Sequence, residues 1–286
     1  MLKRLVKRWR HDAGGSHYEY VPEGWARETT DSLVKGWNVA TVVDTQLARL
    51  DAWRESFAGT APLGVTNANR AASTGDLVTH NTAVTFAYVV ALAARKKDRL
   101  SLLDWGGGVG QYCFAAEAAV PGVAIDYHCK EVPVQCNHGR RVLPNATFYT
   151  DDDQFAGRRF DLVFASGSLH YAQDWQTVLA RLAAATGEYL FVTRLPVVFD
   201  AESFVYLQRA YAHGYDTEYL GWALNRSEFL AAAESQGLQL VREFLVSESA
   251  HIAGAPEDCQ SRGFLFERTQ RGVSPTPDPR SPTPVP

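Results

Sequence analysis

A cluster of glycines behind an acidic residue is the part of this 286-residue sequence with the clearest chemical meaning. The apolar residues 100–103 lead into Asp104, and the glycines that follow are Gly106, Gly107, Gly108 and Gly110. Glycine is needed where a backbone takes positive φ or lies directly against a ligand. A helix that begins just after such a turn offers unpaired amide hydrogens to the bound molecule. The segment therefore predicts a nucleotide-binding turn.

The spacing of these glycines separates two classes of cofactor. A dinucleotide-binding turn follows the pattern Gly-x-Gly-x-x-Gly or Ala, and the sixth position counted from Gly106 is Gln111. Glutamine is too large for the close contact between strand and helix that a small residue allows there. A nicotinamide oxidoreductase is therefore a less favoured alternative.

An acidic residue also follows the next apolar segment, where an open parallel sheet binds its ligands. Glu131 comes directly after residues 122–130 and about 20 residues beyond the glycines, which is a usual distance for a ribose-binding acid. A carboxylate at this place can accept hydrogen bonds from both hydroxyls of a nucleoside. The alternative is an acid that only stabilises the start of the next helix through the helix dipole.

The pattern Asp-x-Gly-x-Gly-x-Gly, formed by Asp104, Gly106, Gly108 and Gly110, resembles motif I of the class I S-adenosylmethionine-dependent methyltransferases. In that family the turn holds the methionine and ribose parts of the cofactor. The resemblance covers about residues 96–268. It implies S-adenosylmethionine as cofactor and transfer of a methyl group to an acceptor.

The resemblance also gives a role to the acids that follow the third apolar segment. In such enzymes an acid at this point binds the exocyclic amine of adenine. We expect Asp152 to do so, with Asp151 as the second candidate, because most of a run such as 151–153 caps a turn or faces solvent. The run does not have the spaced oxygen ligands of a cation site, and no metal is expected.

Residues 166–171, after the fourth apolar segment, face both the methyl group and the acceptor in this family. Ser166 is expected to contact the cofactor. His170 is the candidate catalytic residue, because a neutral imidazole can take a proton near pH 7. The alternative is that His170 only shapes the pocket, since methyl transfer depends mainly on alignment and desolvation. Arg194, after the fifth segment, is a candidate partner for an anionic acceptor group.

A closer likeness is to bacterial methyltransferases associated with surface-polysaccharide gene clusters. It rests on Trp25 and Trp37 near the N-terminus, on the triple glycine, and on the Glu-x-Pro pattern of residues 131–133. The likeness implies a sugar or a related small acceptor. The alternative from another class is a non-catalytic nucleoside-binding or scaffold protein of a polysaccharide pathway.

Alternating strands and helices must position these residues. The strands predicted for a parallel sheet are residues 100–103, 122–130, 146–149, 160–164 and 188–193. Residues 238–246 and 261–267 are expected to close the sheet as a strand pair. The predicted fold is α/β, with a Rossmann-like, doubly wound, mostly parallel sheet, a terminal antiparallel strand and an N-terminal helical block.

The chain is predicted to divide into four segments. They are a basic flexible N-terminus (1–20), a helical block or lid (21–95), the methyltransferase core (96–270) and a disordered proline-rich tail (271–286). The helical block is expected to cover the glycine turn and contribute to the acceptor pocket. Asn81 is expected to cap its last helix.

The composition of the chain limits the kinds of partner and the cell compartment that can be expected. A net charge of −4 gives no reason to expect nucleic acid, so the expected partner is a small acceptor, either a sugar or an anionic metabolite. The four cysteines have no metal-ligand spacing and are expected to be reduced thiols. With no predicted signal peptide or membrane span, a cytoplasmic protein is expected. Residues 1–10 carry five cations among apolar residues, and a weak membrane-surface contact is the alternative to a solvated tail. No oligomeric state is indicated.

Overall fold

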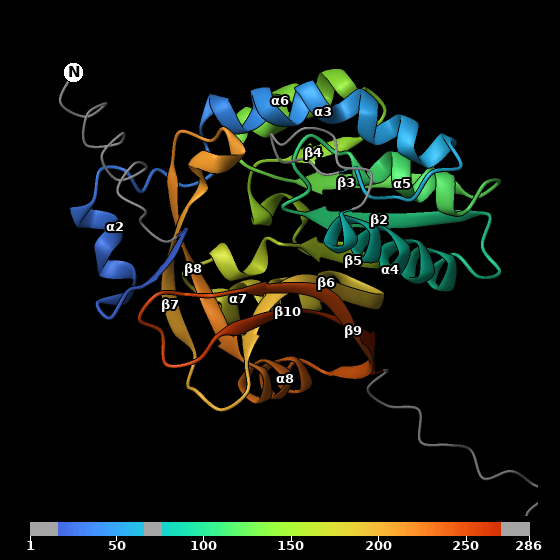
Figure 1. Cartoon of the computed structure of the whole chain (residues 1–286). Helices are drawn as coiled ribbons and strands as arrows, with labels where there is room; N and C mark the ends of the chain where they lie inside the picture. The colour runs from blue at the N-terminus through green and yellow to red at the C-terminus, as the bar shows by residue number, and fades with distance from the viewer. Residues whose placement is uncertain (1–16, 66–75, 270–286) are drawn as a thin grey trace, which may run out of the picture.

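The computed structural model describes residues 17–65 and 76–269, in which ten strands join in one sheet (Figure 1). The neighbouring strands β4, β3, β2, β5 and β6 run parallel, β10 lies antiparallel beside β6, and β9 pairs with β10. These strands are β2 (Arg99–Trp105), β3 (Ala124–Lys130), β4 (Thr147–Tyr149), β5 (Phe160–Ser166), β6 (Thr186–Val198), β9 (Leu238–Ala250) and β10 (Cys259–Arg268). All seven predicted strands and the predicted α/β fold are confirmed.

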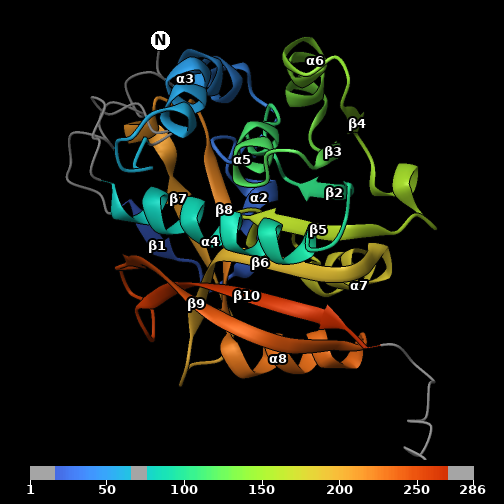
Figure 2. The same ribbon diagram turned by 90° about the vertical axis from the view of Figure 1, so that its right-hand side faces the viewer.

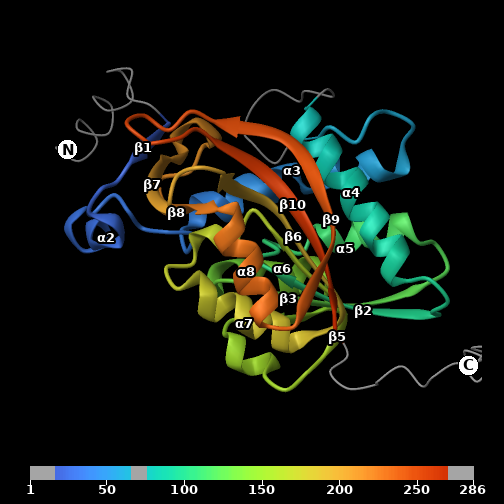
Figure 3. The same cartoon turned by 90° about the horizontal axis from the view of Figure 1, so that it is seen from below.

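Helices cover both faces of the sheet, which explains why its central strands are apolar on both sides. One face carries α3 (Ala40–Ala58), α4 (Leu77–Ala93), α5 (Tyr112–Ala119) and α6 (Pro133–Val142), and the other carries α7 (Trp175–Ala185) and α8 (Arg226–Ser235) (Figures 2 and 3). Leu102 and Phe164 pack with the first group, whereas their neighbours Leu103 and Val163 pack with the second. Two buried cores, one on each face, therefore hold the sheet.

Three further strands were not predicted. They are β1 (Tyr18–Tyr20), β7 (Phe204–Arg209) and β8 (Glu218–Asn225), which pair antiparallel in the order β1-β7-β8. β5 pairs with one edge of β6 as far as Thr193. β8 pairs with the same edge further along, at Val197 and Val198. The three strands therefore extend the sheet beyond the carboxyl end of β5, where open parallel sheets bind ligands (Figure 1).

The N-terminal part is less helical than expected. α3 and α4 confirm the predicted helices, but between residue 17 and the start of α3 only η1 (Gly24–Ala26) and α2 (Arg27–Thr30) are helical. α4 is capped by Asp76, whose carboxylate accepts a hydrogen bond from the amide of Thr79 at 2.7 Å, so the prediction of Asn81 as cap was wrong. Tyr18–Tyr20, within the segment expected to be flexible, form β1. Residues 1–16 and the predicted tail 271–286 lie outside the described residues.

Short 3-10 turns complete the described elements. They are η2 (Asp152–Phe155), η3 (Leu169–Tyr171) and η4 (Ala210–His213). All four cysteines are buried and free. Within the described ranges, no helix is both long and apolar enough to cross a membrane.

Candidate functional site

The turn between β2 and α5 is built from glycines that leave no room for a side chain. Three of them have positive φ, namely Gly106, Gly108 and Gly110. A Cβ atom on Gly106 would lie 2.3 Å from the Cβ of Ser168. One on Gly107 would lie 2.4 Å from a carboxylate oxygen of Asp104. The backbone of the turn is therefore held tightly, and only glycine fits at these places.

Asp104 lies beneath this turn and is fully buried. Its Oδ2 accepts a hydrogen bond from the hydroxyl of Tyr127 at 2.5 Å, and its Oδ1 has no hydrogen-bond partner among the described residues. Burial raises the pKa of this carboxyl group to about 7. The structure therefore places Asp104 against the lower side of the turn, where it supports Gly107.

Glu131 meets the turn from the end of β3. Because β2 and β3 pair in parallel, their carboxyl ends lie side by side. One carboxylate oxygen of Glu131 accepts from the amide of Gly108 at 3.2 Å, and the other accepts from the amide of Val132 at 2.6 Å. Val132 is the N-cap residue of α6, so the carboxylate of Glu131 lies at the start of this helix as well as at the turn. The structure brings together the acid and the glycines that the sequence singled out.

Helix α3 covers the other side of the turn. A Cβ atom on Gly108 would lie 3.0 Å from the Oε1 atoms of both Gln46 and Gln111. Neither oxygen has a hydrogen-bond partner in the described part of the chain. The indole of Trp53 donates to the carbonyl of Gln111 at 3.2 Å, which ties α3 to the start of α5. An N-terminal helix therefore reaches the glycine turn.

The acids after β4 lie at the same edge of the sheet. Asp151 caps η2 by accepting from its second backbone amide at 2.9 Å. Asp152 accepts from the indole of Trp105 at 2.9 Å and lies 3.7 Å from Nζ of Lys130 and 3.5 Å from a guanidinium nitrogen of Arg181. Its carboxylate is therefore already engaged by three side chains. No group of three or more His, Cys, Asp and Glu side chains within 17–65 and 76–269 could hold a metal ion.

The segment after β5 joins the turn to the rest of the site. The hydroxyl oxygens of Ser166 and Tyr112 lie 3.2 Å apart. The hydroxyl of Ser168 donates to the carbonyl of Trp105 at 2.8 Å. Gly167, between the two serines, has a positive φ of 60°. Ser166 therefore lies beside the first residue of α5, the helix that follows the glycine turn.

A hollow of about 430 Å³ lies beside this segment, at the carboxyl ends of β5 and β6. This is a usual size for a small-molecule pocket. Its aromatic wall consists of Tyr18, Trp37, Trp53, Tyr112, Tyr171, Tyr206, Tyr215 and Tyr219. Trp37 stacks on Tyr219 with 4.3 Å between ring centroids. Because Tyr206 lies on β7 and Tyr219 on β8, the strands that the sequence analysis missed form part of this pocket.

His170 lies in the pocket wall and is only 3% exposed. Its ring is 4.0 Å from that of Tyr171, and its Nδ1 has no hydrogen-bond partner among the described residues. Burial, together with the nearby charge of Arg194, lowers the pKa of the imidazole to about 3. The ring is therefore neutral near pH 7 and poorly suited to hold a transferred proton.

Arg194 also lies in the pocket, where it pairs with Glu248 of β9. Two guanidinium nitrogens donate to the two carboxylate oxygens, each at 3.4 Å. The charge of Arg194 keeps the pKa of Glu248 below its ordinary value. Sequence reasoning did not identify Glu248, because nothing in the residues around it marks it as part of a site. The pair means that Arg194 is not an isolated cation.

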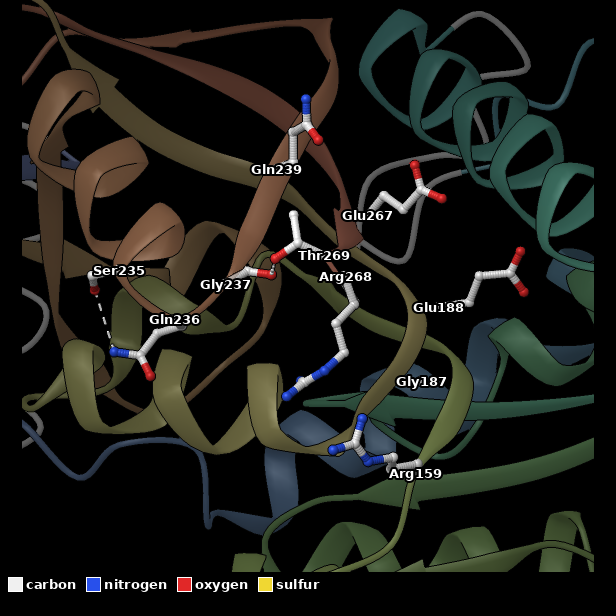
Figure 4. Close-up of a pocket in the computed structure, with 10 residues that line it drawn as sticks. All are labelled: Arg159, Gly187, Glu188, Ser235, Gln236, Gly237, Gln239, Glu267, Arg268 and Thr269. Carbon is white, nitrogen blue, oxygen red and sulfur yellow. Dashed lines mark hydrogen bonds between the residues drawn. The ribbon is translucent and has the colours of Figure 1, made fainter. Parts of the chain in front are cut away.

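A larger hollow of about 1030 Å³ lies at the opposite end of the sheet (Figure 4). It is bordered by the first residues of β6 and β9 and the last of β10, including Glu188, Gln239 and Arg268. Ligands of open parallel sheets bind at the carboxyl ends of the strands, and this hollow lies at their amino ends. None of the residues that the sequence singled out is among those that line it.

Comparison with known proteins gives one family. Residues 79–243 match the family described as "Methyltransferase domain". The matched segment contains the glycine turn, Glu131, His170 and Arg194. No curated protein matches the chain.

Similar solved structures include three with low sequence identity. Mitomycin 7-O-methyltransferase MmcR is 20% identical, with a TM-score of 0.43, and the match covers 66% of this chain and 55% of MmcR. Magnesium protoporphyrin IX methyltransferase (ChlM) from Synechocystis PCC 6803, with bound SAH, is 14% identical over 78% of this chain and 96% of that one, with a TM-score of 0.47. The N-terminal domain of EvdMO1, in the presence of SAH and D-fucose, is 17% identical over 79% and 99%, with a TM-score of 0.48.

Proposed function

Because this chain belongs to the methyltransferase domain family, we propose that it methylates an oxygen or nitrogen atom of a small, sugar-like acceptor. S-adenosylmethionine is the methyl donor of this Rossmann-like methyltransferase. The main support for the proposal is that the carboxylate of Glu131 contacts the glycine turn next to an aromatic pocket of about 430 Å³. The donor and the acceptor would occupy these two adjoining places.

The residues around the turn fit the donor. The glycines exclude side chains, so a ligand can lie directly on the backbone amides and the start of α5. Glu131 can accept hydrogen bonds from the ribose hydroxyls, since its carboxylate already lies at the turn. Asp151 or Asp152 would lie on the adenine side and Ser166 on the methionine side. Asp104 would act through the turn that it supports.

The chain itself has to align the acceptor and exclude water. S-adenosylmethionine, when bound, supplies an electrophilic methyl group on a positively charged sulfur. Tyr112, Gly167 and His170 line the pocket, and Tyr112 also begins the helix that follows the glycine turn. An acceptor in the pocket would therefore face the donor across these residues. Alignment and exclusion of water by the aromatic wall are the contributions that methyl transfer most needs.

The character of the pocket supports a sugar-like acceptor. Tyrosine and tryptophan present an apolar ring together with a polar tip, which suits a sugar with apolar ring faces and hydroxyl edges. The pocket wall has eight such residues. The likeness of the triple glycine and of residues 131–133 to methyltransferases of surface-polysaccharide gene clusters supports the same acceptor class. We therefore propose a role in polysaccharide synthesis.

Calorimetric titration of the purified chain with S-adenosylmethionine, S-adenosylhomocysteine and NAD tests the donor site. We expect saturable binding of the first two and none of NAD. Glu131→Ala should weaken binding about 100-fold, or about 2.7 kcal/mol, because the ribose hydroxyls lose a charged partner. Asp153→Ala is the matched control, since its side chain is 84% exposed.

Each alternative function predicts a different result in the binding and methyl-transfer experiments. Binding of NAD without S-adenosylmethionine would indicate an oxidoreductase. Binding of S-adenosylmethionine without methyl transfer to any of a panel of glycosides would indicate a nucleoside-binding protein.

A further inference from the structure

The Arg194–Glu248 pair in the pocket depends on an irregularity in β6. β10 and β6 pair antiparallel, but their register shifts at Gly263, where Thr193 and Arg194 both face one residue of β10. Arg194 has a φ of 53°, which L-residues rarely adopt. A β-bulge of this kind turns a side chain out of its regular alternation and is common next to active sites. The bulge therefore turns the side chain of Arg194 toward the pocket that it lines.

A second irregularity lies directly across β10, in β9. There the register shifts at Ser261, so that residues 246–248 of β9 face a single residue of β10. Ser247, next to Glu248, has a φ of 63°. In the described part of the chain only three non-glycine residues have positive φ, and two of them are Arg194 and Ser247. Strained backbone persists where the surrounding structure imposes it, and it concentrates at functional sites.

The pair is open to the pocket and is loosely joined. The side chains of Arg194 and Glu248 are 41% and 33% exposed, and both line the hollow. Their two contacts of 3.4 Å are longer than the roughly 2.7–2.9 Å of a good charge-assisted hydrogen bond. By contrast, Arg226 and Glu243, a pair that also involves β9 but does not line the hollow, make contacts of 2.9 and 2.6 Å. The pocket pair therefore keeps donors and acceptors for a ligand.

The other charged side chains of the wall already have partners. Asp76 caps α4 through the amide of Thr79, and Arg209 pairs with Glu19. The hollow thus presents a cation and an anion side by side rather than a net positive charge. An anionic acceptor approaching Arg194 would meet the carboxylate of Glu248 within the same pair.

We propose that the Arg194–Glu248 pair selects an uncharged acceptor with neighbouring hydroxyl groups, such as a neutral sugar. One hydroxyl can donate to the carboxylate while it or its neighbour accepts from the guanidinium. The inference rests on the proposed function and narrows its acceptor. It replaces the expectation that Arg194 alone binds an anionic group.

Binding of three simple glycosides to the full chain saturated with S-adenosylhomocysteine tests this selection. The probes are methyl glucopyranoside (neutral), methyl glucuronide (anionic) and methyl glucosaminide (cationic), and the measurement is ligand-observed NMR titration. We expect the neutral glycoside to bind at least about tenfold more tightly than the anionic one. Glu248→Gln should reverse this order, because it leaves the charge of Arg194 unmatched. Arg194→Gln should instead favour the cationic glycoside, and the control Glu243→Gln should leave the wild-type order unchanged.

Several results would overturn the proposal. They are equal binding of the neutral and anionic glycosides by the wild-type chain, no binding of any glycoside, or an unchanged order in a folded Glu248→Gln variant. The comparison of the neutral and anionic glycosides uses the wild-type chain alone, so it tests the proposal even if a substitution unfolds the chain. Failure of the wild-type chain to bind S-adenosylhomocysteine would contradict the proposed function itself, whereas a wrong order of glycosides contradicts only this inference.

Discussion

The donor side and the acceptor side of this site are built in different ways. The donor side is centred on two adjacent parallel strands and the turns after them, where the bare backbone of the glycines meets the carboxylate of Glu131. The acceptor pocket is lined by residues from His17 to Ser261, including the antiparallel strands β1, β7 and β8.

The difference shows where this fold leaves room for variation. A turn in which a Cβ at Gly106, Gly107 or Gly110 would lie within 2.6 Å of a neighbouring side-chain atom tolerates few changes. The pocket, by contrast, takes side chains from the antiparallel strands β1, β7 and β8 and from the irregular edges of β6 and β9. Function depends on sites built onto a fold, and here much of the proposed acceptor pocket lies on strands outside the parallel core. Substitutions on the two sides should therefore have separable effects.

The largest effect is expected on the donor side, from Gly106→Ala. The new Cβ would lie 2.3 Å from that of Ser168, and the residue would keep a φ of 76°. The turn must move to admit it, and we expect the affinity for S-adenosylhomocysteine to fall by about 100-fold or more in calorimetric titration. The affinity of the variant for the acceptor should fall only if the acceptor needs bound donor in order to bind.

A glycine elsewhere provides the matched control for this substitution. Gly157 has almost the same φ, 77°, but a Cβ there would have no atom within 4 Å. Gly157→Ala should lose stability through backbone strain, about 1–2 kcal/mol, yet keep its affinity for S-adenosylhomocysteine. Equal losses of affinity in both variants would show that the close packing of Gly106 does not matter.

A smaller effect is expected from Asp104→Asn, and it concerns stability. The folded pKa of Asp104, about 7, is raised above the ordinary 3.8, so the folded chain holds a proton that the unfolded chain has lost. This contribution to stability is complete below the unfolded pKa and is lost as the pH rises through about 7. Asparagine is neutral at every pH and can still accept from Tyr127. The free energy of unfolding of the variant minus that of wild type should therefore rise by about 1–3 kcal/mol when the pH is raised from about 5 to about 8.

Urea unfolding at the two pH values measures this difference. Other groups titrate in the same range, and comparing wild type with the variant at each pH cancels their contributions. Asp153→Asn serves as the control, because its exposed side chain should leave the difference near zero. A constant difference between wild type and Asp104→Asn at both pH values would mean that Asp104 is ionised in the folded chain.

The same contrast explains how much of the molecule could be predicted from its sequence. The strands of the core are apolar runs that end at acids or glycines, and Asp104, the glycines and Glu131 lie within one stretch of the chain. Pairing of adjacent parallel strands then places them together without further information. The strands of the parallel core and the meeting of the glycines with Glu131 could be predicted for this reason.

The acceptor side could not be predicted because its determinants are not local. β7 pairs with β1, which lies about 190 residues away in the sequence, and β8 pairs with β7 and with the end of β6. Glu248 reaches the pocket through a register shift against β10, which the residues of β9 alone do not reveal. The expected cap Asn81 was displaced by Asp76 because the helix begins several residues earlier than its apolar pattern suggested.

The smallest effect is expected on the acceptor side, from His170→Asn. A true general base contributes about 10²–10⁴-fold to the rate, and its loss should be of that size. Because burial and Arg194 lower the pKa of His170 to about 3, its imidazole has little capacity to hold a proton near neutral pH. We therefore expect kcat to fall less than about tenfold and the KM for the glycoside acceptor to rise, as for a residue that shapes the pocket. The pH profile of kcat should have no step near 6.5, the ordinary pKa of histidine, in either wild type or the variant. A wild-type step near that value that disappears in His170→Asn would restore His170 as the base and make the acceptor side depend on proton transfer as well as alignment.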